Sequence, residues 1–412
     1  MERLYDKLKA YSESDFYAFH MPGHKRNKTL LGIELPYDLD ITEIDGFDDL
    51  HHADGILKEE QERAARVFGA EESHFLVNGS TAGILSAVMG CTHRGDKILV
   101  ARHCHKSIYH AIYMNGLVPR YVYPEFDISM HMNGEISKED VAKALAAEPD
   151  IKAVVIVSPN YDGVVSDVKG IAEVAHSYRI PLIVDEAHGP HFGFHPAFPG
   201  RANDLGADVV INSLHKTLPS LTQTAILHIN GKLANRRRIK KYLDMLQSSS
   251  PSYIFMASLD ACVDFLDGKC EEAFELYVER LQKFREELKP LQHLQILRTE
   301  HYDISKVVIS TANANITSPE LADRLRKEYH LEMEMTGGTY VLAMTTVADT
   351  QEGLNRLKAA LLEIDDQLEA KTAVSGSIEI SGELPRLEQY FTPQEAEREE
   401  DGEAEGFRKV RT

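Results

Sequence analysis

Short apolar runs alternate with longer amphipathic segments between residues 55 and 230. The apolar runs are typical of buried strands, whereas the segments between them carry apolar residues three or four positions apart, as helices do. Strands that alternate with helices predict an α/β domain with a mainly parallel, doubly wound sheet. The predicted strands are 74–79, 97–101, 120–124, 151–159, 180–189, 207–213 and 224–229, and the predicted helices are 56–70, 80–92, 106–116, 137–148 and 168–179.

The pattern changes after residue 230, where long charged helices are predicted. Helices are expected at 232–248, 270–291, 318–330 and 351–370, and strands at 306–311, 331–335 and 340–346. This mixture predicts a smaller α+β domain reached through a helical connector. We therefore expect an N-terminal arm (1–54), a large α/β domain (55–245), a small α+β domain (246–385) and an acidic tail (386–412). The tail is poor in apolar residues and is predicted to be disordered.

Composition narrows the class of protein. The chain has 412 residues, more than one hydrophobic core usually supports, and 45 Lys and Arg against 65 Asp and Glu give a net charge of −20. So acidic a chain is a poor general binder of nucleic acid or anionic membranes. The four cysteines form no CxxC pair, the N-terminus lacks a signal-peptide core, and the apolar runs are too short to span a membrane. These features predict a cytoplasmic protein.

Polar residues follow five of the predicted strands. They occur in "NGSTAG" (78–83), "RHCHKS" (102–107), "SPNYDG" (158–163), "DEAHGPH" (185–191) and "NSLHK" (212–216). Ligands of open α/β sheets bind outside the carboxyl ends of the strands, so we expect these side chains to share one site.

The first of these segments has the form of a phosphate cradle. Gly79 permits a tight turn, and the hydroxyls of Ser80 and Thr81 precede a predicted helix whose first N–H groups are free. A Ser or Thr at this position also serves as an ordinary helix cap, and this segment by itself does not exclude that role.

Three further residues complete the pattern. Asp185 follows four apolar residues, where a carboxylate requires a cationic partner such as a protonated ring nitrogen or a structural salt bridge. Lys216, unless it is an ordinary surface lysine, is a candidate Schiff-base amine. His105, unless it is a surface histidine, is placed to stack on an aromatic ring. Together with the cradle, these residues predict a site for pyridoxal phosphate (PLP).

With these residues in place, the sequence resembles the ornithine/lysine/arginine decarboxylase family, which has an aspartate-aminotransferase-like fold. The similarity covers most of the chain, and its specific features are "PGHK" (22–25), "DEAHG" (185–189) and "SLHK" (213–216). It implies a PLP-dependent transferase-like large domain and an N-terminal arm near the active site. Among members of the family, we expect a short bacterial type with a truncated C-terminus.

The resemblance also implies a role for each site residue. Lys216 would carry the cofactor, Asp185 would bind its ring nitrogen, and His188 would lie beside the reacting carbon. Either Lys216 or His188 would return a proton to Cα. The remaining positions would bind the cofactor: His105 and Ala187 on the two faces of the ring, and Gly79, Ser80, Thr81, Ser213 and His215 around the phosphate.

The function implied is PLP-dependent decarboxylation of arginine, lysine or ornithine in polyamine metabolism, by a homodimer or larger homo-oligomer with its active site at the subunit interface. Among the three substrates, arginine or lysine is favoured slightly. Glu332 and Glu334, or Asp45, Asp48 and Asp49, are candidates for binding the substrate side chain, although surface salt bridges would also explain them.

Other functions use similar residues. An aminotransferase, lyase or aldolase would need the same lysine, aspartate and phosphate cradle, and a homologue with weak or no activity is the alternative suggested by the unusual tail. A metal hydrolase is suggested by His188, His191 and His195, together with His103 and His105. Gly189, Pro190, Gly193 and Pro196 break any helix there, so we expect a loop and no metal site.

Overall fold

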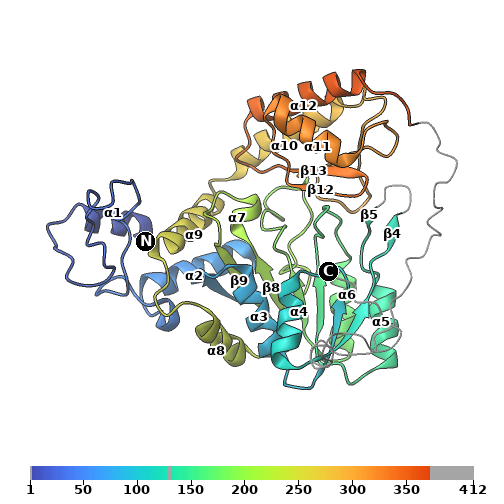
Figure 1. Cartoon of the computed structure of the whole chain (residues 1–412). Helices are drawn as coiled ribbons and strands as arrows, with labels where there is room; N and C mark the ends of the chain where they lie inside the picture. Colours follow the sequence, from blue (N-terminus) through green and yellow to red (C-terminus); the bar gives the residue numbers. More distant parts are fainter. Residues whose placement is uncertain (1, 128–131, 372–412) are drawn as a thin grey trace, which may run out of the picture.

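A seven-stranded sheet forms the centre of the computed structural model, which describes residues 2–127 and 132–371 (Figure 1). Its strand order is β1-β9-β8-β7-β6-β2-β3, and β9 alone runs antiparallel to its neighbours within the sheet. The predicted mainly parallel α/β sheet is therefore confirmed. The strands are β1 (Glu72–Leu76), β2 (Lys97–Ala101), β3 (Val118–Val122), β6 (Val154–Val157), β7 (Leu182–Asp185), β8 (Val209–Asn212) and β9 (Ala225–Ile229).

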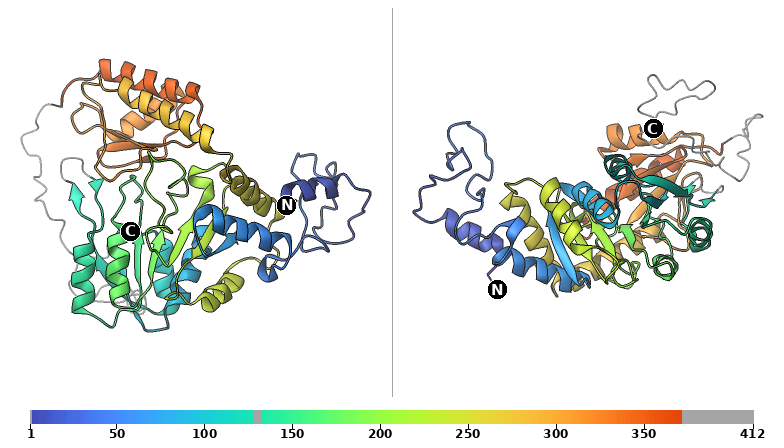
Figure 2. Two further views of the ribbon diagram at one scale, coloured as in Figure 1. Left: turned by 180° about the vertical axis from the view of Figure 1, so that it is seen from behind. Right: turned by 90° about the horizontal axis from the view of Figure 1, so that it is seen from below.

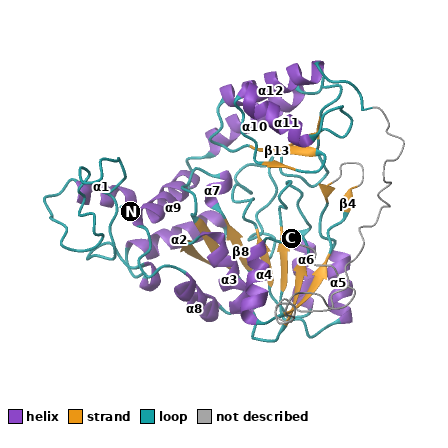
Figure 3. Cartoon of the chain, in the orientation of Figure 1, coloured by secondary structure: helices purple, strands orange, loops and turns teal. Residues whose placement is uncertain are grey.

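Helices cover both faces of this sheet (Figure 3). Successive strand residues face opposite sides, so Ile98 and Val100 pack with α3, α4 and α8, whereas Leu99 and Ala101 pack with α5 and α6. Burial on both faces explains the continuous apolar runs of the strands. The helices are α3 (Gly79–Cys91), α4 (Lys106–Asn115), α5 (Lys138–Ala147), α6 (Val168–Ser177) and α8 (Arg236–Leu246).

A second, antiparallel sheet of order β10-β11-β13-β12 lies above the carboxyl ends of the large sheet and is covered by α10, α11 and α12 (Figure 1). Thr317 and Glu320 form a capping box that begins α11. The elements are α10 (Glu271–Glu287), β10 (Gln295–Ile296), β11 (Lys306–Ser310), α11 (Ser318–Tyr329), β12 (Met335–Thr336), β13 (Tyr340–Met344) and α12 (Gln351–Asp366).

Several elements differ from the sequence-based prediction. Of the predicted strand 331–335, only Met335 belongs to a strand, β12, and residues 331–334 are irregular. Helix α9 (Tyr253–Leu266) was not predicted, and it packs against α1 (Leu4–Ser12) and α2 (Ile56–Phe68). Other short elements, also not predicted, are the pair β4 (Phe126–Asp127) and β5 (Met132–Asn133), the turn η1 (Leu50–His52) and α7 (Leu214–Thr217).

The N-terminal arm projects away from the rest of the molecule (Figure 2). Helix α1 packs on α9, and after it the chain runs mostly as loops to residue 49. These loops expose large apolar side chains, including Phe16, Tyr17, Phe19 and Leu30, of which Phe19 is 88% exposed. So many exposed apolar groups on one segment are typical of an interaction surface.

The predicted domain boundaries remain predictions. Helix α9 follows the predicted boundary at residue 245, yet it packs against α1 and α2, which precede that boundary. The predicted acidic tail, 386–412, lies outside the described residues. Within the residues that the structure describes, no helix is both long and apolar enough to cross a membrane.

A buried ion cluster joins α2 to α9. The Arg63 guanidinium donates to Glu60 and Asp260, whose carboxylates are both fully buried, and its Nη1 lies 3.2 Å from Asp264. Two buried carboxylates therefore share the positive charge of Arg63. Burial, and then the adjacent Asp260, raise the pKa of Glu60 to about 8.

This shift predicts a pH-dependent stability. The pKa of Glu60 rises from about 4.5 in the unfolded chain to about 8 in the fold, so its contribution is complete below pH 4.5 and is lost as the pH rises toward 8. Glu60→Gln, which imitates the protonated carboxyl, should raise the melting temperature by roughly a few degrees at pH 8.5 and much less at pH 5. Glu59→Gln, at an exposed neighbouring position, is the control. If the difference in melting temperature between Glu60→Gln and the wild type is the same at pH 8.5 and pH 5, the argument is contradicted.

Candidate active site

A cavity of about 670 Å³ opens where the carboxyl ends of the strands meet. Each of the five polar segments that follow strands β1, β2, β6, β7 and β8 contributes to its wall. The lining residues are Asn78, Gly79, Ser80, Thr81, Ile84, His103, His105, Val157, Tyr161, Asp185, Ala187, His188, His215, Lys216, Thr222 and Gln223. The cavity therefore combines an apolar floor with converging polar groups, the usual composition of a small-molecule site.

Lys216 lies on the short helix α7, immediately after β8. Its Nζ is 2.9 Å from Nε2 of His188. Burial lowers the pKa of Lys216, while the charges of Asp185 and Glu334 oppose that effect. A lysine with a lowered pKa is more often neutral, and its amine can then attack a carbonyl carbon.

Asp185 ends β7 and is only 4% exposed. Its Oδ1 accepts one hydrogen bond, from the backbone N–H of Ala187 at 3.2 Å, and no salt bridge to it is found among the described residues. Burial raises the pKa of Asp185, and the nearby Lys216 partly counters this. Such a carboxyl favours a cationic hydrogen-bond donor that the cavity would have to admit.

His188 connects Lys216 to the wall of the cavity. Its ring centre lies 4.7 Å from that of Tyr161, and its Nδ1 is buried without a hydrogen-bond partner in the described structure. Burial, and then the charges of Lys306 and Lys216, keep the pKa of His188 well below its usual value. Its surroundings therefore favour the neutral imidazole, and its Nε2 lies within hydrogen-bond distance of Lys216.

His105 caps the N-terminus of α4. Its Nδ1 accepts from the backbone N–H of Ser107 at 3.3 Å and lies 2.8 Å from the Ser107 hydroxyl. Burial and the charge of Lys216 lower the pKa of His105. These contacts fix a neutral imidazole ring at the wall of the cavity.

The N-terminus of α3 forms the phosphate-sized end of the cavity. Gly79 begins this helix with φ of +73°, a conformation that favours glycine, and the N-cap Asn78 makes no side-chain capping bond. The first N–H groups of the helix therefore remain available to an anion. Nearby, the hydroxyls of Ser80 and Ser213 lie 2.7 Å apart, and Nδ1 of His215 donates to the Thr224 carbonyl at 2.8 Å.

The fold brings the predicted site residues together. Nine of them line the cavity, and the tenth, Ser213, is fully buried and contacts Ser80. Sequence reasoning missed Tyr161, Thr222 and Gln223. All three lie in segments that resemble the family, Tyr161 in "SPNYDG" (158–163) and the other two in "SLHKTLPSLTQTA" (213–225), but nothing in these segments assigned them a role.

The three histidines of the metal-hydrolase alternative have separate partners. His188 contacts Lys216, His191 lies 3.0 Å from the Thr217 hydroxyl and 3.1 Å from Asp303, and His195 lies 3.0 Å from Glu275. This arrangement does not favour a shared metal ion.

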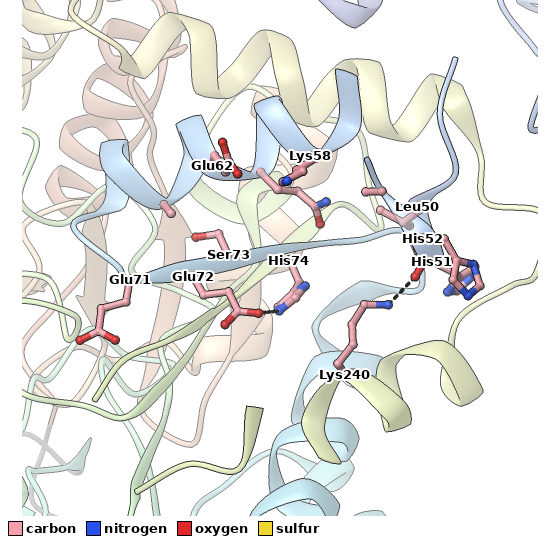
Figure 4. Close-up of a pocket in the computed structure, with 13 residues that line it drawn as sticks. Leu50, His51, His52, Lys58, Glu62, Glu71, Glu72, Ser73, His74 and Lys240 are labelled. Atoms are coloured by element: carbon pink, nitrogen blue, oxygen red, sulfur yellow. Dashed lines mark hydrogen bonds and ion pairs between the residues drawn. The ribbon is translucent and has the colours of Figure 1, made fainter. Parts of the chain in front are cut away.

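A second cavity, of about 420 Å³, lies at the β1 edge of the sheet (Figure 4). It contains several ionisable groups, and two of them have close partners: His74 lies 2.8 Å from Glu72, and Lys240 donates to the His51 carbonyl at 2.7 Å. It lacks a buried carboxyl without a salt bridge, such as Asp185 in the first cavity, so the first cavity remains the candidate active site.

Known proteins are similar to this chain over most of its length. The family model described as "Orn/Lys/Arg decarboxylase, major domain" matches residues 3–318. The arginine decarboxylase of Bacillus subtilis (strain 168) is 34% identical over 409 residues, which cover 95% of this chain and 83% of that protein.

Two solved structures resemble the fold. The constitutive lysine decarboxylase of E. coli has a TM-score of 0.77 at 22% identity, over 88% of this chain and 60% of that chain. The ureidoglycine-glyoxylate aminotransferase of Bacillus subtilis has a TM-score of 0.62 at 14% identity, over 76% of this chain and 85% of that chain. The matched part of this chain thus spans 60% of the length of the lysine decarboxylase, and both likenesses concern the fold.

Proposed function

Because this chain belongs to the Orn/Lys/Arg decarboxylase family and is a decarboxylase of a basic amino acid, we propose that its substrate is arginine and that PLP held at Lys216 carries the reaction. The observation that carries this proposal is the presence, in one cavity, of a half-buried lysine that contacts His188 and a buried carboxyl that lacks a cationic partner. The similarity to a protein named arginine decarboxylase supports the choice among the three basic amino acids.

The residues of the cavity fit PLP. The uncapped N-terminus of α3, with Ser80, Thr81 and Ser213, would hold the phosphate, and Asp185 would accept a hydrogen bond from the protonated ring nitrogen. His105 and Ala187 would contact the two faces of the ring, with His215 near the phosphate. When bound, PLP would supply an electron sink for the electron pair of the bond that breaks as carbon dioxide leaves.

The protein groups have two tasks in this reaction. Asp185 would stabilise a positive charge at the ring nitrogen, because its side chain is buried and accepts one hydrogen bond among the described residues. Lys216 and His188, 2.9 Å apart, hold the proton that is returned to the substrate Cα, either from Nζ or from Nε2. Ile84 and Val157 line the cavity, and their apolar side chains would limit water around the carboxylate that is lost.

The same proposal includes a homodimer, in the cytoplasm, with the active site at the subunit interface. The exposed apolar side chains of the N-terminal arm support it, because a second copy of the chain would cover them. We expect sedimentation of the holoenzyme to give a molecular mass of at least twice the chain mass of 46.3 kDa. Phe19→Ser combined with Leu30→Ser should shift it toward the monomer, whereas an unchanged dimer would contradict a role for this arm.

The direct test is release of carbon dioxide by the purified holoenzyme from arginine, lysine and ornithine in separate assays. The proposal expects release from arginine above all, with formation of the corresponding amine for polyamine synthesis. Preferential release from lysine or ornithine would overturn the substrate assignment alone. Binding of PLP without release from any of the three would overturn the reaction and favour an aminotransferase-like activity, which an assay of amino-group transfer would detect.

A further inference from the structure

Three buried side chains, here called the His191 bridge (Thr217, His191 and Asp303), join the helix that carries Lys216 to the segment before β11. Nδ1 of His191 lies 3.0 Å from the Thr217 hydroxyl, and its Nε2 lies 3.1 Å from Oδ1 of Asp303. Each of the three residues is at most 2% exposed. The helix α7 is therefore tied to the small sheet through the interior of the protein.

Asp303 is a carboxylate although it is fully buried. It accepts hydrogen bonds from the backbone N–H of Ser305 at 2.9 Å and from the Ser305 hydroxyl at 2.7 Å, and Nζ of Lys306 lies 3.7 Å away. Burial alone would raise the pKa of Asp303, but His191, Lys306 and Ser305 outweigh burial and hold that pKa below its usual value. A fixed negative charge thus forms one end of the His191 bridge.

His191 is held rigidly between its two polar partners. A carboxylate can only accept, so Nε2 of His191 donates to Asp303, and Nδ1 is left to bond with the Thr217 hydroxyl. The rings of Phe192 and Phe198 contact the imidazole edge to face, with ring centres 4.9 and 4.7 Å from its own. Because both nitrogens are bonded and the ring is packed, the position of Asp303 is passed on to Thr217.

Lys306, the first residue of β11, is fully buried and has no part in the proposed reaction. Its Nζ makes no hydrogen bond within the described structure, and its stem packs closely on Gly163, where a Cβ would lie 2.7 Å from Cγ of Lys306. Lys306 supplies the countercharge for Asp303. After burial, its charge is also the largest influence that lowers the pKa of His188.

Helix α7 has only four residues, too few to hold its position by its own hydrogen bonds. The position of Lys216 therefore depends on contacts at the two ends of this helix. At the start, the Ser213 hydroxyl contacts that of Ser80, and at the end the Thr217 hydroxyl contacts His191. Because Thr217 directly follows Lys216, a shift at Thr217 would move the backbone that carries the lysine.

We propose that Asp303 is a positioning residue for Lys216. It acts through His191 and Thr217, and it keeps the amine within reach of His188. This inference rests on the proposed function, in which Lys216 carries the cofactor. None of the described residues that line the cavity belongs to the small sheet, so the small sheet would influence the reaction through the His191 bridge and not by contact with the substrate.

The first test compares Thr217→Val with Thr217→Ser. Valine keeps the shape of threonine but lacks the hydroxyl, whereas serine keeps the hydroxyl, and neither change touches the buried pair of Asp303 and Lys306. In the full-length apo chain, the rate of acetylation of Lys216, followed by peptide mass spectrometry across a pH series, reports the pKa of its amine. Burial lowers this pKa, so an amine that moves toward water should titrate about one pH unit higher in Thr217→Val. Thr217→Ser should retain the wild-type profile.

The second test measures kcat on the holoenzyme. Thr217→Val and Asp303→Asn should each lower kcat by roughly 10-fold with a much smaller change in KM, because a misplaced reacting group slows the reaction more than it weakens binding. Since both residues act through one bridge, the double variant should lose no more activity than the more damaged single variant.

Asp365→Asn is the matched control for Asp303→Asn. Asp365 is also a buried aspartate, on α12, but its carboxylate accepts from the backbone N–H groups of residues 292–294 and does not line the cavity. Asp365→Asn should therefore keep the wild-type kcat and the wild-type acetylation profile of Lys216. A loss of kcat equal to that of Asp303→Asn would overturn the inference, because any buried aspartate near the small sheet would then have the same effect.

The acetylation profile separates this inference from the proposed function, since it needs neither cofactor nor substrate. If the wild-type chain released no carbon dioxide, the proposed function would fail, and the profile would still test the His191 bridge. Equal acetylation midpoints in the wild type, Thr217→Val and Thr217→Ser would overturn the inference. A double variant whose loss of kcat is the product of the two single losses would also overturn it, because Thr217 and Asp303 would then act independently.

Discussion

Replacement of Lys216 by alanine is expected to lower decarboxylation by roughly 10³-fold or more and to remove the visible absorption of the bound cofactor. The physical reason is that the amine would be both the covalent anchor of PLP and one of the two proton donors near the substrate Cα. His188 would remain, but its pKa, held well below the usual value, makes it a poor substitute for an ammonium donor.

The measurements for Lys216→Ala are carbon dioxide release and the absorption spectrum after addition of PLP. Lys143→Ala, on the exposed face of α5, is the control for the loss of a lysine. Because Lys216 is largely buried, a melting curve of the apo form should accompany both variants. An unchanged absorption band in Lys216→Ala would show that the cofactor is attached elsewhere, and would refute the assignment of this lysine.

Replacement of Asp185 by asparagine should lower kcat by roughly 10²- to 10³-fold, the range for removal of one preorganised electrostatic group. Asparagine retains an acceptor for the Ala187 N–H, so the shape of the site should persist. What is lost is the negative charge that would keep the ring nitrogen protonated. The measurement is kcat at saturating PLP and substrate.

The adjacent Glu186 provides a matched control for Asp185. It is also buried, and its pKa is raised to about 8 by burial, but its oxygens accept from Asn212 at 3.0 Å and from the Ala202 N–H at 2.8 Å, away from the cavity. Glu186→Gln should therefore keep kcat within a few-fold of the wild type. If kcat fell equally in Asp185→Asn and Glu186→Gln, the loss would be explained by a less stable fold. That result would contradict a specific role for Asp185.

Asp185→Asn also has an expected effect on stability. Burial raises the pKa of Asp185 in the apo protein, so its contribution to folding is present below the unfolded-state pKa near 3.8 and is lost as the pH rises through the folded-state value. At pH 7 the apo form of Asp185→Asn should thus melt no lower than the apo wild type, while it binds PLP more weakly. An unchanged melting temperature together with weaker PLP binding would show that the charge of Asp185 contributes to ligand binding and not to the stability of the fold.

The strands of the large sheet, and the polar residues at their carboxyl ends, could be predicted from the sequence. The strands buried on both faces are continuous apolar runs, and the helices around them have clear caps, such as Ser137 before α5 and Gly116 after α4. Because polar residues gather after such strands for few reasons other than ligand binding, the cavity-lining set, including Asp185 and Lys216, could be predicted from its place in the pattern.

The missed features depend on contacts that local patterns do not encode. Helix α9 is apolar on nearly all sides because it is enclosed by other elements, so it lacks the amphipathic period of a surface helix. Tyr161 and Glu334 meet across two domains and are 173 residues apart in the sequence. The arm and its exposed aromatic residues follow no periodic pattern, because loops and not a regular element carry them.

The position of β9 has a consequence for how the protein folds. β9 lies between β1 and β8, and its register pairs Leu76 with Ala225, so the first strand of the sheet joins it only after residues 225–229 have been synthesised. Such pairing between distant parts of the chain raises the contact order, which slows folding, and it leaves both edges of β1 unpaired until β9 has formed. Ser80 follows β1 and Ser213 follows β8, so their contact forms only when this strand is in place. We therefore expect competence to bind phosphate to appear late in refolding, after the sheet is complete.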